Sequence, residues 1–208
     1  MSPGNRRKRR AQQASSHKFP YTSVMDKQAG HTLITLARSA IATRLGVNQP
    51  APAADQQWLR KPGASYVTLL RDNKIRGRTG TLKAHRALAD DVIANAIAAA
   101  CNDLRFQPIT ADELTDTRIE ICLLSALEPV SAHNEASALA CLRPGIDGVV
   151  FEYGRHHSSV LPEAWNDAAD SAEFMAQLKY KAGLPPDFWD HGVKVAKYTV
   201  YKWDETRL

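Results

Sequence analysis

Residues 65–81, SYVTLLRDNKIRGRTGT, predict a β-hairpin. Residues 65–70 and 75–81 form the two arms, and Asp72-Asn73 supplies turn residues between them. Two glycines interrupt the second arm. A glycine inside a strand marks a bulge, or a position that another backbone or a ligand approaches closely.

The second arm of this hairpin alternates glycines with cations. Because side chains alternate faces along a strand, we expect Lys74, Arg76 and Arg78 to share one face, with the two arginines about 7 Å apart. Two guanidinium groups beside exposed glycine amides would suit a phosphate or a carboxylate. An edge strand whose cations prevent sheet-to-sheet aggregation explains the same pattern, and both interpretations stay open at this point.

Helical and strand patterns are interspersed along the rest of the chain. Apolar spacings predict helices over residues 33–45, 88–100, 136–142 and 172–182, strands over 118–125 and 193–203, and a second hairpin of 149–153 with 158–161. No strand–helix–strand unit repeats. We therefore predict an α+β fold with a mainly antiparallel sheet and packed helices, with a compact core plus a smaller lobe.

The positive charge of the chain is concentrated at its N-terminus. The formal net charge is +5, but residues 1–18 hold six cations and no acid; removing these six from the 27 cations leaves 21 against 22 acidic residues. A nearly neutral fold lacks the broad basic face of a duplex-binding protein, although it leaves room for a local cationic cleft. We expect residues 1–24 to be a disordered basic tail, or the product of a misassigned upstream start, and residues 25–208 to be a single domain.

The sequence also predicts the compartment and the absence of common catalytic groups. No apolar run is long enough to cross a bilayer, and the basic cluster lacks the apolar core of a secretory signal, so we expect a cytoplasmic protein with no membrane association. Cys101, Cys122 and Cys141 are widely spaced and are expected to be small buried residues. No nucleotide-binding, hydrolase or zinc-protease motif is present, so we predict no metal, no cofactor and no catalytic residue.

Glu120 stands out because it lies within the apolar segment 118–125. It is either an outward-facing residue on a half-exposed strand or a buried carboxylate that needs a partner.

The order and spacing of several short motifs resemble the AMMECR-type domain over residues 30–205. The motifs are Arg76-Gly77-x-x-Gly80-Thr81, Asp103-x-Arg105-Phe106, Glu113-Leu114, Pro144-Gly145-x-Asp147-Gly148, Leu161-Pro162-x-x-Trp165 and Lys181-Ala182-Gly183-Leu184. The resemblance implies a compact α+β domain with a smaller appended lobe. It also implies the role of protein A in AmmeMemoRadiSam systems, beside a MEMO-type and a radical-SAM protein, and one hypothesis is that such systems modify RNA or a nucleobase.

The chain departs from the family pattern at Arg78, where the family usually has cysteine. Arginine cannot act as a nucleophile, a redox group or a metal ligand, so cysteine chemistry is not expected here. The candidate ligand-binding residues are Arg76, Gly77, Arg78, Thr79, Gly80, Thr81, Arg105, Glu120 and Lys181.

Three hypotheses follow from the motifs and the departure. The first is a non-catalytic module that recognises an anion, a nucleotide or RNA. The second is a scaffold for the MEMO-type and radical-SAM partners, in which the glycine-rich strand offers backbone for pairing. The third, a free-standing enzyme, has no candidate nucleophile in the motif.

Overall fold

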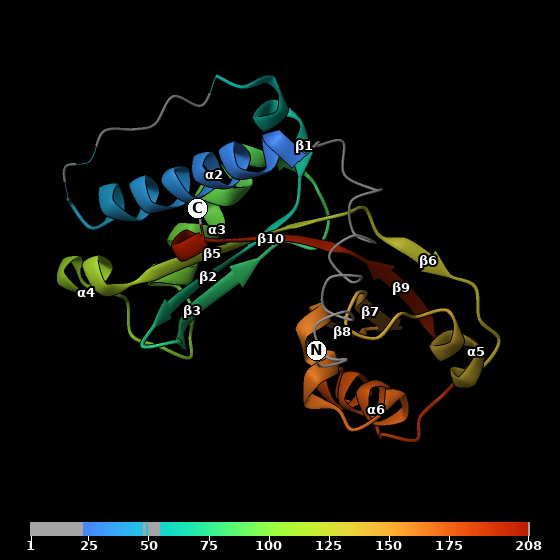
Figure 1. The fold of residues 1–208 in the computed structure, drawn as a ribbon. Coiled ribbons are helices and arrows are strands. Elements are labelled where there is room, and N and C mark those ends of the chain that lie inside the picture. The colour runs from blue at the N-terminus through green and yellow to red at the C-terminus, as the bar shows by residue number, and fades with distance from the viewer. Residues whose placement is uncertain (1–22, 48, 50–54, 208) are drawn as a thin grey trace, which may run out of the picture. The chain divides into compact units, whose positions relative to one another are not determined.

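The computed structural model describes residues 23–47, 49 and 55–207 (Figure 1). Residues 1–22 of the predicted basic tail lie outside the described residues. The chain divides into two compact units: the first comprises the described parts of Phe19–Leu124 and Tyr201–Leu208, and the second comprises Ser125–Val200. The second unit is therefore an insertion in the sequence of the first.

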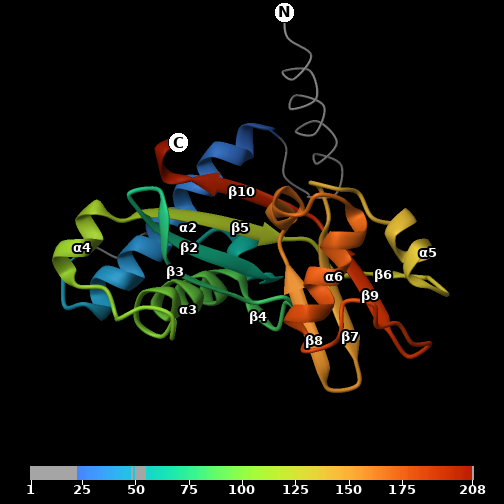
Figure 2. The same ribbon diagram turned by 90° about the horizontal axis from the view of Figure 1, so that it is seen from below.

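The first unit is built on a four-stranded sheet in the order β10 (Val200–Asp204), β5 (Arg118–Leu124), β2 (Ser65–Arg71) and β3 (Lys74–Gly80). Helix α3 (Leu88–Cys101) packs against β2 and β3, and helix α2 (Ser23–Arg44) packs against α3 and β5 (Figures 1 and 2). The smaller elements are η2 (Gln57–Arg60), the paired strands β1 (Pro62–Gly63) and β4 (Arg86–Ala87), α4 (Ala111–Asp116) and η4 (Glu205–Arg207).

The predicted hairpin is confirmed as β2 and β3. Asp72 and Asn73 have φ values of 51° and 60°, and left-handed residues at both central positions match the twist that a two-residue hairpin requires. The pairing shifts after Leu69, which lies opposite Gly77, whereas Leu70 lies opposite Ile75. Strand β3 thus contains one extra residue at a bulge, and it forms the edge of the sheet.

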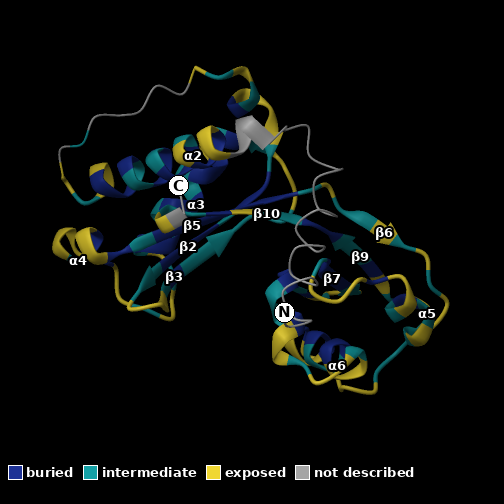
Figure 3. Cartoon of the chain, in the orientation of Figure 1, coloured by how far each residue is buried: buried dark blue, intermediate teal, exposed yellow. Residues whose placement is uncertain are grey.

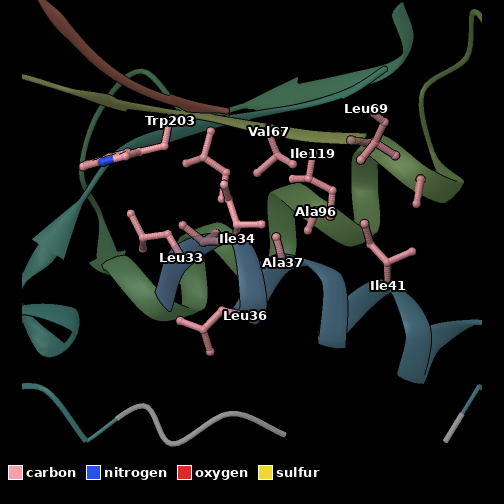
Figure 4. Packing of buried hydrophobic residues seen from close by; sticks show 14 of the residues in the cluster. Leu33, Ile34, Leu36, Ala37, Ile41, Val67, Leu69, Ala96, Ile119 and Trp203 are labelled. Atoms are coloured by element: carbon pink, nitrogen blue, oxygen red, sulfur yellow. The ribbon is translucent and has the colours of Figure 1, made fainter. Parts of the chain in front are cut away.

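The core of the first unit lies between α2, α3 and the sheet. Figure 4 shows Leu33, Ala37 and Ile41 of α2 beside Val67 and Ile119 of the sheet, and all five are fully buried. These buried residues have the apolar spacing from which the helix was predicted, so that prediction is confirmed. The chain leaves the helix through Gly46, whose φ of 75° is left-handed.

The second unit has its own antiparallel sheet, in the order β6 (Glu128–Val130), β9 (Lys194–Tyr198), β7 (Gly148–Tyr153) and β8 (His156–Val160). It also contains α5 (Glu135–Ala140), η3 (Pro162–Asp167) and α6 (Ser171–Lys181). Trp165 stacks on Phe174 with ring centroids 3.5 Å apart and donates its Nε1 to the Asp147 carbonyl at 2.7 Å. The mixture of helices with antiparallel sheets confirms the predicted α+β class.

The single strand predicted over residues 193–203 is wrong. The segment forms β9 and β10, which belong to different sheets. The division falls at Thr199, whose backbone exchanges hydrogen bonds with Ser125: Ser125 N donates to Thr199 O at 2.9 Å, and Thr199 N donates to Ser125 Oγ at 3.0 Å. Apolar residues alternate with lysines on both sides of Thr199, so no local pattern marked this break.

Burial corrects two further predictions (Figure 3). Strand β5 is buried along almost its whole length, and Glu120 within it is only 7% exposed, so a half-exposed strand is the wrong description. Cys122 is buried as expected, but Cys141, at the C-cap position of α5, is exposed, and Cys101 is only partly buried. Among the described residues, no helix combines the length and apolar character that crossing a membrane requires.

Candidate functional site

The site lies at the edge strand β3, where segments distant in sequence meet. Arg78 N donates to Asp103 Oδ2 at 2.8 Å, and Arg76 Nη1 donates to the Gln107 carbonyl at 2.8 Å. The loop after α3 therefore covers part of the exposed edge of the sheet. This arrangement joins the Arg-Gly motif to the Asp-x-Arg-Phe motif.

Arg76 forms internal contacts rather than presenting its charge outward. Its Nε and Nη2 each donate to one oxygen of Glu113 at 3.1 Å, and the two side chains are 18% and 19% exposed. The same carboxylate closes a capping box on α4, because Thr110 N donates to Glu113 Oε2 at 3.0 Å. The hydrogen bonds from Arg76, followed by the one from Thr110, hold the pKa of Glu113 below its usual value against the opposing effect of burial. Arg76 is therefore a fixed link between β3 and α4.

Arg105 is also paired, but it stays open to solvent. Its Nε and Nη2 donate to the two oxygens of Asp103 at 2.9 and 2.7 Å, and its side chain is 58% exposed. These bonds are the main cause that holds the pKa of Asp103 far below its usual value, and they raise the pKa of Arg105. The guanidinium carbon lies 5.4 Å from the centroid of the Phe106 ring, a cation–π distance.

Arg78 differs from both neighbouring arginines. Within the described part of the chain, its guanidinium forms no hydrogen bond or ion pair, and its Nε is buried without an acceptor. Arg78 lies opposite Thr68, and Thr68 lies opposite Glu120. The carboxylate in this row is already occupied, because Glu120 Oε2 lies 2.7 Å from Lys202 Nζ. Arg78 is therefore a cation without a counter-ion in the row.

The two glycines of the motif are required by packing inside the unit. A Cβ at Gly77 would collide with the Ala99 carbonyl oxygen of α3, and a Cβ at Gly80 would collide with the ring of Tyr66. Gly77 thus marks the close approach of another backbone. Thr79 lies opposite Val67 in the hairpin.

Sequence reasoning missed a buried polar network next to Thr81. Asp91 is fully buried and accepts from Ser65 N at 2.9 Å, Ser65 Oγ at 2.7 Å and Arg86 Nε at 2.9 Å. Asn95 Nδ2 donates to the same carboxylate at 3.0 Å and to Thr81 Oγ1 at 3.1 Å. The network ties both ends of the hairpin to α3.

The remaining candidate, Lys181, belongs to the second unit. It is exposed at the end of α6. The first unit thus brings together Arg76, Arg78 and Arg105, with Glu120 in the same strand row as Arg78.

Comparison with known proteins supports a family assignment. Residues 34–203 match the AMMECR1 family. The chain is 32% identical over 178 residues to a protein of Methanothermobacter thermautotrophicus, covering 84% of this chain and 93% of that one. It is 34% identical to a protein of Thermococcus onnurineus, covering 85% and 90% of the two chains. The crystal structure of the uncharacterized protein PH0010 from Pyrococcus horikoshii is similar, with a TM-score of 0.76, 30% identity, and coverage of 85% of this chain and 91% of that one. The chain belongs to the AMMECR1 family.

Proposed function

We propose that this AMMECR1-family chain is a non-catalytic recognition component that binds an anionic group of a nucleotide or RNA at Arg78. It acts in the cytoplasm, together with MEMO-type and radical-SAM proteins that carry out the chemistry. The observation that carries this proposal is the Arg78 guanidinium, which lacks a carboxylate partner among the described residues while Arg76 and Arg105 each have one.

Electrostatics favours an anion at this position. A partly buried charge without a counter-ion has lost hydration and gained no compensating hydrogen bond. A phosphate or carboxylate supplies the missing counter-charge and hydrogen-bond acceptor, since the guanidinium fork matches these groups. The neighbouring acid, Glu120, competes little because Lys202 already neutralises it.

The same residue argues for a binding role rather than a catalytic one. Arginine stays protonated at physiological pH and offers no lone pair for attack or for metal ligation. Arg76 and Asp103 hold the edge strand through internal bonds, so they shape the site without reacting.

Binding of a nucleoside triphosphate and of a short RNA to the full chain tests the proposal. We expect Arg78→Gln to weaken binding by roughly tenfold or more, because a charge-assisted hydrogen bond is lost. Arg155→Gln is the matched control, because Arg155 is an exposed arginine in the β7–β8 turn. A second control replaces the cations of residues 6–10 with glutamine and removes any affinity that the basic segment contributes. Equal binding by Arg78→Gln and the wild type would contradict the proposal.

A second candidate function, a scaffold for the same partners, is favoured by Leu104. This residue is 100% exposed although the residues on both sides are fixed by the Asp103–Arg105 ion pair. A rigidly displayed apolar side chain suits a pocket on a partner protein. Leu104→Ser should abolish association with purified MEMO-type and radical-SAM proteins, whereas Val47→Ser, at a residue that is 38% exposed, should not. Association that survives Leu104→Ser would count against Leu104 as a contact.

A further inference from the structure

We infer that Arg105 and Phe106 form a stacking platform for a nucleobase, so the ligand held at Arg78 is a single-stranded nucleic acid segment. The inference rests on the proposed function, because it assigns the base that accompanies the anion. The carrying observation is a planar guanidinium that is fixed in orientation, placed over an aromatic ring and half open to solvent.

The orientation of the platform is set by Asp103. Two parallel hydrogen bonds, 2.9 and 2.7 Å long, hold the Arg105 fork, and Asp103 Oδ1 also accepts from Arg105 N at 3.2 Å. The Asp103 side chain is only 7% exposed, so its carboxylate is itself fixed. Arginine planes held in this way stack on unpaired bases as aromatic rings do.

The platform and Arg78 share one anchoring atom. Asp103 Oδ2 accepts from Arg105 Nη2 at 2.7 Å and from Arg78 N at 2.8 Å. The Arg105 guanidinium and the Arg78 backbone amide therefore bind the same carboxylate oxygen, which anchors both residues at one point. A nucleotide offers a phosphate and a base on one flexible backbone, which matches this pair of neighbouring groups.

A single strand fits the site better than a duplex. Bases in a duplex are already stacked on one another, so only an unpaired base can lie on an exposed guanidinium plane. Residues 19–208 hold 21 cations and 22 acids, too balanced a surface for an extended phosphate track. The charge of Arg105 is compensated by Asp103, so its contribution to affinity should depend weakly on salt, unlike that of Arg78.

The test compares two probes on the full chain: a ten-nucleotide single-stranded RNA and an abasic oligonucleotide of the same length and charge. The wild type should prefer the base-bearing probe by roughly 5- to 100-fold. Arg105→Lys keeps the charge but loses the plane, so it should remove most of this preference. Phe106→Leu, a second variant, should reduce it too. Quenching of a 2-aminopurine base in the RNA gives an independent readout of stacking, and it should disappear in Arg105→Lys.

The outcomes separate this inference from the proposed function. If the wild type binds both probes equally and Arg78→Gln weakens both, the platform is overturned and the anion site stands. If neither probe binds the wild type, the platform is overturned, and the anion site is overturned too when the nucleoside triphosphate also fails to bind. A preference for the base-bearing probe that Arg105→Lys and Phe106→Leu leave unchanged also overturns the platform.

Discussion

Arg76 and Glu113 lie 37 residues apart in the chain and form a bidentate ion pair, with both nitrogen–oxygen distances 3.1 Å. Arg71 contacts the same carboxylate at 3.0 Å, but its side chain is 41% exposed against 18% for Arg76. Because Glu113 also caps α4, the Arg76 pair holds β3 and α4 together. Arg76 thus contributes to folding and shapes the edge strand, while Arg78 keeps its charge available.

Replacing Arg76 should destabilise the protein far more than replacing Arg71. Arg76→Ala removes the shielded partner of Glu113 and should lower the free energy of unfolding by about 2–3 kcal/mol. Arg71→Ala removes an exposed ion pair and should change it by less than about 1 kcal/mol. Urea denaturation of the two variants measures both values. Equal losses would show that the shielded Arg76 pair stabilises the protein no more than the exposed Arg71 pair.

Acid should weaken the same region through Asp103 and Glu113. Both carboxyl groups have a folded-state pKa below the unfolded values of about 3.9 and 4.3, so their stabilisation is present above those values and is lost as pH falls toward the folded pKa. Asp103→Asn removes the stabilisation that the ionised Asp103 carboxylate contributes. The difference in unfolding free energy between wild type and Asp103→Asn should therefore stay constant from pH 8 to 6 and shrink below about pH 4. Denaturation curves at pH 7, 5, 4 and 3 test this, and a difference undiminished at pH 3 would contradict it.

Local sequence patterns predicted most elements of the fold, whereas they did not predict contacts between side chains that are distant in sequence. The φ values of Asp72 and Asn73 and the buried positions of α2 follow from turn chemistry and helical spacing. The bond between Arg76 and Glu113 depends on the fold of the intervening chain, which no local pattern specifies. For the buried network around Asp91, the sequence did carry a signal. Asp91 lies three residues after Leu88 and one before Val92, which places it on the apolar face of its helix.

The two motif glycines should respond differently to an added methyl group. Gly77→Ala brings Cβ against the Ala99 carbonyl, part of a helix backbone that cannot move independently, and should destabilise by about 3 kcal/mol or more. Gly80→Ala collides with the Tyr66 ring, which a second substitution can remove. Adding Gly80→Ala to Tyr66→Ala should therefore cause less further destabilisation than Gly80→Ala alone, as a double-mutant cycle in urea would show. Strict additivity would mean that Tyr66 is not the obstacle.

Asp90 and Asp91 are neighbours in the first turn of α3, yet only Asp91 should be essential for stability. Both carboxylates favour the helix dipole, but Asp90 is exposed whereas Asp91 is fully buried and accepts from Ser65, Arg86 and Asn95. Asp91→Ala leaves these donors without their acceptor and should lower the free energy of unfolding by about 3–5 kcal/mol, while Asp90→Ala should change it by less than about 1 kcal/mol. Asp91→Asn keeps the shape and should fall between them. Thermal and urea unfolding of the three variants provide the comparison, and a stable Asp91→Ala protein would show that the hairpin does not depend on this network.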